Sequence, residues 1–432
     1  MDPSAVPKPN LKIEAIAGMT TFFTMAYIVV VNPQILSADG KTGMAFNGVL
    51  TATVVICFTM TLLMGLYARL PFAVAPGMGI NAFFTYTIVM GKGVPWPTAL
   101  GIIFWTGVFF LLISVTPVRE SIAKAIPAEL RIAAAAGIGL FLTFIGLKNA
   151  GFVVADPVTF VKLGALGKPA LLTILGIAIA SFLMSRKNPF AFILAIATVT
   201  IIAWILGLVS APSQVFSLPD FKSVFFKLDI FGALKLALVP SIVSILFTDL
   251  FDSISTFIGV AHAADLLDEH GHPRNLRQGL IVDSLATMGA GLAGTSSGTA
   301  YIESIAGISM GGRTGLTSVF TALCFLPCFF IAPLAGTVPA FATAAVLILV
   351  GAAMFKSIGR INFSKLEEGV PAFLTLILIP LTFSITQGIL WGFISHVGLY
   401  LMAGRRREIH PVMYALALVS IGLLILERIK FV

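Results

Sequence analysis

Long apolar segments separated by short polar stretches follow one another along almost the whole chain. Most of them are close to the ~20 apolar residues that an α-helix needs to cross a bilayer. They are continuous and do not alternate apolar with polar residues, which excludes a transmembrane β-barrel. The pattern predicts fourteen membrane-spanning segments, at residues 14–36, 46–67, 72–90, 97–116, 130–147, 169–185, 190–208, 236–261, 277–293, 296–310, 315–335, 338–355, 369–386 and 388–403.

The fourteen segments form two sets of seven. Because seven is an odd number, the second set enters the membrane from the side opposite to the first, so the halves can be inverted repeats. We predict a first repeat at 1–208, an extracellular or periplasmic connector at 209–235 and a second repeat at 236–403. Residues 404–432 hold a basic cluster at 405–407 and an apolar run at 411–427, expected to form an extra helix.

The third segment of each set differs from an ordinary span. Residues 71–82 contain two prolines and two glycines, and residues 294–312 are rich in glycine, serine and threonine. Short, interrupted segments at corresponding positions of two halves are the best sequence-level pointer to a transporter's binding site. We therefore predict half-helices in spans 3 and 10. The alternative is a pair of glycine faces that serve only helix packing.

Composition narrows the class of protein. The 432 residues are 58% hydrophobic and only 11% charged, and the mean hydropathy is +1.02. Soluble domains do not have such values, so the chain is expected to be an all-α polytopic membrane protein in contact with lipid. Cys57, Cys324 and Cys328 lie in apolar segments and predict no disulfide framework, metal site or other cofactor.

Positive charge predicts the orientation. With a cytoplasmic N-terminus, most of the 27 lysines and arginines fall on the cytoplasmic side, as the positive-inside rule requires. The first residues lack the basic-then-apolar pattern of a cleaved signal, so we expect Met1 to stay inside the cell. The net charge of +8 is attributed to these anchoring loops and not to a nucleic-acid partner. A multi-pass protein of the inner (plasma) membrane is expected. The outer side receives only Lys41, Lys92, Lys148, Lys162, Lys168, Lys222, Lys227 and Lys235.

Four carboxylates of the second half lie inside apolar segments: Asp249, Asp252, Asp283 and Glu303. An ionisable residue within a membrane span is costly and is a functional candidate by default. We expect Asp252 and Glu303 to act in binding, whereas Asp249 and Asp283 are open between a functional and a structural role. Asn81, at the start of the first half-helix, is expected to shape the site.

Two look-alike motifs are set aside. Residues 294–298 match the G-x-S-x-G elbow of serine hydrolases, but that motif needs a strand-turn-helix in an α/β sheet, which this chain does not predict. Three histidines, His262, His270 and His272, share a loop with Asp265, Asp268 and Glu269. A solvated loop is the simpler interpretation than a metal site.

Several motifs in order and spacing resemble the AzgA-like purine permeases, a branch of the nucleobase-ascorbate transporter superfamily. They are residues 18–28 (GMTTFFTMAYI), Asn32-Pro33, 75–82 (APGMGINA), 251–256 (FDSIST) and 294–304 (GTSSGTAYIES). The resemblance runs from Leu11 to the C-terminus. It implies a core of spans 1–4 and 8–11, a gate of spans 5–7 and 12–14, and a homodimer.

The resemblance also assigns roles to matching positions. It implies that Glu303 of span 10 and Asp252 of span 8 are the substrate carboxylates, and that Met78 and Gly79 offer backbone groups to the ligand. The wider superfamily usually has a glutamate where this chain has Asp252. It implies that Thr24 and Asn81 border the pocket and that Ser304 assists. On chemical grounds, the rings of Phe251, Phe83 and Phe84 are available as aromatic faces for a flat base.

The function expected from residues and resemblance together is import of hypoxanthine, guanine or adenine by proton symport, with an elevator-like movement. Glu303 and Asp252 are the expected proton-coupling groups, with Asp283 as a relay. A purine is flat and edged with N–H donors and ring-nitrogen acceptors, which suits carboxylates and free backbone N–H groups. The alternatives are the same fold carrying uracil, xanthine or an anion such as sulfate or bicarbonate. A membrane-embedded enzyme or a channel is a more remote alternative.

Overall fold

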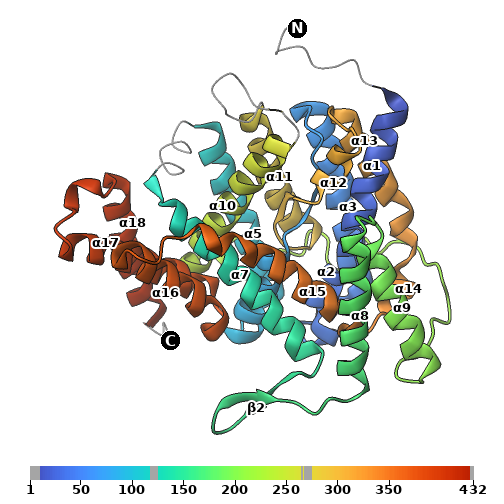
Figure 1. The fold of residues 1–432 in the computed structure, drawn as a ribbon. Coiled ribbons are helices and arrows are strands. Elements are labelled where there is room, and N and C mark those ends of the chain that lie inside the picture. The colour runs from blue at the N-terminus through green and yellow to red at the C-terminus, as the bar shows by residue number, and fades with distance from the viewer. Residues whose placement is uncertain (1–9, 117–124, 264–265, 267–274, 429–432) are drawn as a thin grey trace.

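The structure is a computed structural model that describes residues 10–116, 125–263, 266 and 275–428. It is a bundle of helices, with the N-terminal helix at one edge and the last helices at the other (Figure 1). Five members of the histidine-rich loop, Asp265, Asp268, Glu269, His270 and His272, lie outside the described residues. Among the described residues, no group of His, Cys, Asp and Glu is arranged to hold a metal ion.

The first half follows the predicted order of spans. Span 1 is divided into two helices and span 3 into a strand and a short helix, which continues as a wider π-type helix at Phe83–Gly91. The elements are α1 (Leu11–Met25), α2 (Ile28–Ser37), α3 (Phe46–Leu63), β1 (Val74–Pro76), α4 (Met78–Ala82), α5 (Trp96–Val115), α7 (Ala128–Asn149), α8 (Lys168–Ser185) and α9 (Ala191–Ile205). A hairpin of β2 (Val153–Asp156) and β3 (Phe160–Leu163) joins α7 to α8.

The second half repeats the arrangement. Span 10 is again a short strand followed by a short helix, and span 11 ends in a separate short helix. The elements are α10 (Val239–Ala263), α11 (Leu276–Ala293), β4 (Gly298–Ala300), α12 (Ser304–Ser309), α13 (Gly315–Phe325), α14 (Ala332–Gly336), α15 (Ala340–Phe355), α16 (Leu366–Thr382) and α17 (Ile385–Met402). The apolar run near the C-terminus forms α18 (Pro411–Arg428), which packs against α17.

Eight helices of the described chain are long and apolar enough to cross a membrane on their own. Shorter apolar helices, which include Met78–Gly91 and Ala191–Ile205, account for other predicted spans. Spans 3 and 10 are short because part of each is extended strand. The prediction of an all-α polytopic fold with two inverted repeats of seven spans and half-helices in spans 3 and 10 is confirmed.

The two broken spans meet in a small antiparallel sheet. Val74 pairs with Ala300, Ala75 with Thr299 and Pro76 with Gly298. The pairing continues beyond the strands, because Gly77 N–H donates to the carbonyl of Ser297 at 2.8 Å. Backbone groups at membrane depth must find partners within the protein, and here each extended segment satisfies the other. The sequence predicts the interruptions but not this pairing.

The helices fall into two packing groups. In the first, which we name the core group, α1 packs against α12 and α13, α5 against α10 and α11, and α2 against α3 and α4. In the second, the gate group, α7 packs against α15, α16 and α17, and α8 against α9. Glycines allow the closest approaches: a Cβ on Gly139 of α7 would lie 2.6 Å from the carbonyl oxygen of Gly351 on α15. In the gate group, α7 of the first half thus packs against α15 and α16 of the second half.

The β2–β3 hairpin is held by polar contacts outside the spans. The carboxylate of Asp156 accepts from the N–H groups of Thr159 and Val158, and it pairs with Lys162 at 2.9 Å. The bond from Thr159, followed by the pair with Lys162, lowers the pKa of Asp156 to about 2. This exposed turn therefore keeps its charge pattern through the physiological pH range.

Candidate functional site

The site is built on the start of the half-helix α4. Pro76 ends the strand, Gly77 is extended, and the first bond of the helix runs from Asn81 N–H to the carbonyl of Gly77 at 3.0 Å. The N–H groups of a helix's first turn have no partners within the helix, so they are available to a ligand. In α4 these groups belong to residues on the edge of a cavity.

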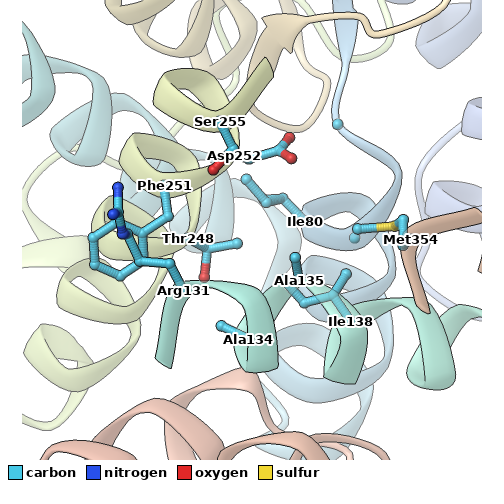
Figure 2. A pocket seen from close by; sticks show the side chains of 12 residues that line it. Ile80, Arg131, Ala134, Ala135, Ile138, Thr248, Phe251, Asp252, Ser255 and Met354 are labelled. Atoms are coloured by element: carbon cyan, nitrogen blue, oxygen red, sulfur yellow. The ribbon is translucent and has the colours of Figure 1, made fainter. Parts of the chain in front are cut away.

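This central cavity lies between the core group and the gate group (Figure 2). The core supplies the start of α4 and one face of α10, and the gate supplies α7 and one residue of α15. The lining residues are Gly77, Gly79, Ile80, Thr248, Phe251, Asp252 and Ser255 from the core, and Arg131, Ala134, Ala135, Ile138 and Met354 from the gate. A ligand here would touch both groups at once.

Asp252 is the carboxylate that lines the central cavity. Thr248 and Ser255 lie one helical turn before and after it, so hydroxyl groups flank it on the same face of α10. Its neighbour Phe251 supplies an aromatic ring to the same space. That ring stacks on Phe247 with 5.8 Å between centroids, and Phe247 meets Phe393 of α17 edge to face. Contacts with the gate therefore help to fix the aromatic wall of the cavity.

Glu303 lies directly before α12, the second half-helix. Its Oε1 atom accepts a hydrogen bond of 2.7 Å from the hydroxyl of Tyr27. The helix α12 that follows Glu303 packs against α10, the helix that carries Asp252. The two predicted substrate carboxylates are thus brought into one region, although Asp252 alone is among the residues that line the central cavity.

Ser304 follows Glu303 in the sequence, and its hydroxyl group bonds to the protein backbone. Its hydroxyl donates to the carbonyl of Tyr301 at 2.7 Å and accepts from Ala73 N–H at 3.0 Å. Ser304 thus ties the start of α12 to the residue before β1. Its side chain is fully buried, and the predicted role beside the ligand gains no support from this geometry.

Asp249 and Asp283 both hold the broken span 10. Asp249 accepts from Thr287 at 2.5 Å and from Ser297 at 2.8 Å. Asp283 accepts from Ser253 and, at 3.4 Å, from Thr299 of β4. Both side chains are fully buried. This geometry favours the structural role that the sequence left open, and neither residue lines the central cavity.

Two other predicted residues, Asn81 and Thr24, are not among those that line the central cavity. Asn81 donates to Asn32 at 3.1 Å, and Asn32 in turn donates to Thr53 and Thr295 at 2.7 and 2.8 Å. Thr24 donates to carbonyl groups of its own helix. Of these two predictions, the site-shaping role of Asn81 fits better, because the bonds of Asn32 connect spans 1, 2, 3 and 10.

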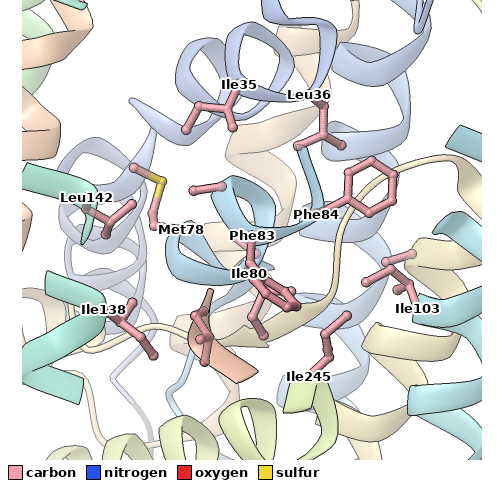
Figure 3. Packing of buried hydrophobic residues seen from close by; sticks show 14 of the residues in the cluster. Ile35, Leu36, Met78, Ile80, Phe83, Phe84, Ile103, Ile138, Leu142 and Ile245 are labelled. Atoms are coloured by element: carbon pink, nitrogen blue, oxygen red, sulfur yellow. The ribbon is translucent and has the colours of Figure 1, made fainter. Parts of the chain in front are cut away.

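Met78 and the two phenylalanines of span 3 belong to the apolar core. Figure 3 shows Met78 on the side of Ile35 and Leu142, and Phe83 and Phe84 within the same packed cluster. Both phenylalanine rings are buried. Only the backbone of this segment, at Gly77 and Gly79, reaches the central cavity together with Ile80.

Sequence reasoning missed two residues near the site. Tyr27 lies in the motif at 18–28, which carries the family resemblance but predicts no role for this residue. Arg131 was counted with the cytoplasmic charges, whereas the structure places it in the first turn of α7 and on the central cavity. Its position inside a predicted apolar segment, at 130–147, was the available signal.

Comparison with known proteins agrees with this architecture. A model of the group described as "Permease family" matches residues 12–390. The chain is 44% identical over 411 residues to the adenine permease AdeP of Escherichia coli, covering 95% of this chain and 92% of the relative. It is 40% identical over 418 residues to the guanine/hypoxanthine permease PbuO of Bacillus subtilis, covering 95% and 96%.

A solved structure shares the fold at low identity. The transmembrane domain of the cyanobacterial bicarbonate transporter BicA superposes with a TM-score of 0.65 and 17% identity, and the match covers 90% of this chain and 98% of that one. At this identity the likeness concerns the fold alone. The match of the family model and the identity to two permeases over nearly full length confirm the resemblance to AzgA-like permeases. The chain is therefore an integral membrane transporter, not an enzyme, and belongs to the permease family.

Proposed function

We propose that the chain imports purine nucleobases together with protons. The observation that carries the proposal is the central cavity, where the start of a half-helix, the carboxylate of Asp252 and the ring of Phe251 face one space. Relatives named as adenine and guanine/hypoxanthine permeases support the same class of cargo.

The chemistry of the central cavity matches the edges of a purine. Free N–H groups at Gly79 and Ile80 can donate to O6 or N7 of the base, and a carboxylate can accept from its ring N–H groups. The Phe251 ring offers a face on which a flat heterocycle can stack, in an offset or edge-to-face arrangement. A purine is neutral and planar, and its polar groups lie only at its edge. It can therefore contact the backbone N–H groups, the carboxylate and the aromatic ring at the same time.

Proton coupling follows from the cost of burying charge. Closure of the cavity over an ionised Asp252 or Glu303 would remove that charge from water, which costs several kcal/mol unless the charge is paired. A proton on one carboxyl removes this cost and supplies a donor for a ring nitrogen of the purine. The loaded, protonated core is then the form that crosses most readily, together with its cargo.

An inward proton gradient is expected to drive accumulation of hypoxanthine in proteoliposomes that contain the purified protein. A protonophore should abolish the accumulation, while exchange of labelled against unlabelled base should persist, because exchange needs no net driving force. The measurement is the uptake of radiolabelled hypoxanthine over time. Accumulation that requires sodium and ignores the pH gradient would contradict proton symport.

Movement of the core group against the gate group would give alternating access. The α7 helix contacts the central cavity through Arg131 at its beginning and a second cavity through Lys148 and Asn149 at its end. At that second end, Gln34 of α2 donates to the carbonyl of Val338 and accepts from Thr343 of α15 at 2.7 Å. These bonds connect core to gate and must break if the core slides.

Removing the Gln34 bonds is expected to open the second cavity, which lies on the outer side in the predicted orientation. A cysteine placed at Leu347, which is buried in that cavity, should react several times faster with a membrane-impermeant maleimide when Gln34→Leu is added. The background carries alanine at the three native cysteines. A cysteine at the exposed Val158 should react equally fast with and without the change. Unchanged labelling of Leu347→Cys would show that these bonds do not hold the outer side closed.

Arg131 supports one alternative cargo. A guanidinium and the N–H groups of a half-helix on one cavity suit an anion or an acidic base such as xanthine. The carboxylates of Asp252 and Glu303, which lie in the same region, argue against an anionic cargo. Competition of labelled hypoxanthine uptake by xanthine, uracil, bicarbonate and sulfate distinguishes the cargoes, and stronger competition by an anion than by guanine would favour the alternative.

A further inference from the structure

Tyr27 occupies a break in the first span. The helix α1 ends at Met25 and α2 begins at Ile28, so Tyr27 lies between them, opposite the start of α12. Its side chain is only 1% exposed. The ring packs edge to face against Phe192 of α9, with 5.1 Å between centroids, and the hydroxyl reaches Glu303. One side chain of the core thus touches both the gate and a predicted substrate carboxylate.

The hydrogen bond from Tyr27 occupies one of the two carboxylate oxygens of Glu303. Tyr27 donates to Oε1 of Glu303 at 2.7 Å, a length typical of an O–H donor on a carboxylate. Within the described part of the chain, no other side chain donates to this carboxylate. A glutamate has three rotatable side-chain bonds, and fixing such a side chain costs conformational entropy. A donor that holds Oε1 beforehand leaves Oε2 in a defined place.

We propose that Tyr27 is a positioning residue that orients Glu303 for the substrate. The Tyr27 hydroxyl holds Oε1, and Oε2 accepts from an N–H group of the purine. The inference rests on the proposed purine transport and deepens it by naming the group that prepares the carboxylate. Preorganisation of this kind raises affinity because the ordering cost is met before the ligand binds.

A purely structural role of the Tyr27 hydroxyl predicts a different result. If the hydroxyl only satisfied a buried phenol, its loss would lower the amount of folded protein and leave the affinity for purine unchanged. If it orients Glu303, its loss weakens binding while folded protein remains. The ring of phenylalanine preserves the contact with Phe192, so Tyr27→Phe removes only the atom in question.

The test is saturation uptake of hypoxanthine by cells that express Tyr27→Phe, normalised to protein in the membrane. We expect KM to rise about tenfold, because Glu303 must then be ordered when the purine binds, with the maximal rate within about twofold of the unmodified protein. Tyr414→Phe is the matched control. It removes the same atom from α18, where the hydroxyl donates to the carbonyl of Arg406 at 3.2 Å, and KM should stay unchanged.

A double-variant cycle tests whether Tyr27 acts through Glu303. Glu303→Asp shortens the side chain by one methylene and takes the carboxylate out of reach of the hydroxyl. Adding Tyr27→Phe to that variant should then change the affinity, measured by calorimetry on purified protein, by less than about twofold. An unchanged KM for Tyr27→Phe alone, or an equal loss in both backgrounds, would overturn the inference. Absence of purine uptake by the unmodified protein would instead reject the proposed function.

Discussion

Glu303→Gln is expected to abolish purine uptake while the protein still reaches the membrane. The change preserves the shape of the side chain but removes the negative charge and the site for a transported proton. It also leaves one acceptor oxygen for two donors, the purine N–H and the Tyr27 hydroxyl, because an NH2 group replaces the other oxygen. Hydrogen bonds to charged groups contribute about 1.5–3 kcal/mol each, so losing one of the two lowers affinity by at least about tenfold, and loss of the proton site removes accumulation as well.

Glu14→Gln is the matched control for this prediction. Glu14 is another buried glutamate of the core group, 3% exposed, whose carboxylate accepts from the hydroxyl of Thr317 and from Arg313 N–H. Its substitution should reduce the amount of folded protein and leave KM unchanged. Both variants are measured as initial hypoxanthine uptake per molecule in the membrane, at several pH values. Normal uptake by Glu303→Gln at every pH would remove Glu303 from the site.

Gly79→Val is expected to disable transport without gross misfolding. Gly79 lies where the half-helix α4 meets α7, and a Cβ added there would be 2.3 Å from Cγ2 of Ile138. A β-branched side chain would fill the edge of the central cavity and separate core from gate. Overpacking of this kind costs about 1–3 kcal/mol, and it would also block approach of a purine to the free N–H groups. Uptake should fall to background levels.

A rescue experiment separates the two reasons for this loss. Gly79→Ala adds only one methyl group, and Ile138→Ala removes the atoms that it would strike. If the contact with α7 is what matters, Gly79→Ala should lower uptake by about tenfold and the double variant should recover most of it. Gly398→Ala on α17, where nothing lies within 4 Å of the added atom, should behave like the unmodified protein. Full uptake by Gly79→Val would show that α4 does not border the transport route.

The fold could be predicted largely from the sequence because its main signal is local. A span is recognised by the length of its own apolar run, and the breaks in spans 3 and 10 by their own prolines and glycines. The pairing of β1 with β4 could not be read in the same way. Each strand has only three residues, too few for a periodic pattern, and its partner lies in the other half of the chain.

The site was predictable only in part, because a charge in an apolar segment has two explanations. Asp252 and Asp249 are both carboxylates on α10, yet one lines the central cavity and the other holds Thr287 and Ser297. Both need polar surroundings, and the sequence does not say whether a ligand or the protein supplies them. Tyr27 was missed because a tyrosine in a membrane helix is ordinary until its hydrogen-bond partner is known.

The β1–β4 sheet also has a consequence for synthesis of the chain. Residues 74–76 leave the ribosome long before residues 298–300, and translation proceeds at roughly 5–20 residues per second. For on the order of ten seconds or more, the first broken span stays in the membrane with extended backbone groups that lack their partner. The core cannot be completed during translation of the first half. Insertion of that half must therefore produce a waiting intermediate, sheltered by other helices or by the insertion machinery until the second half arrives.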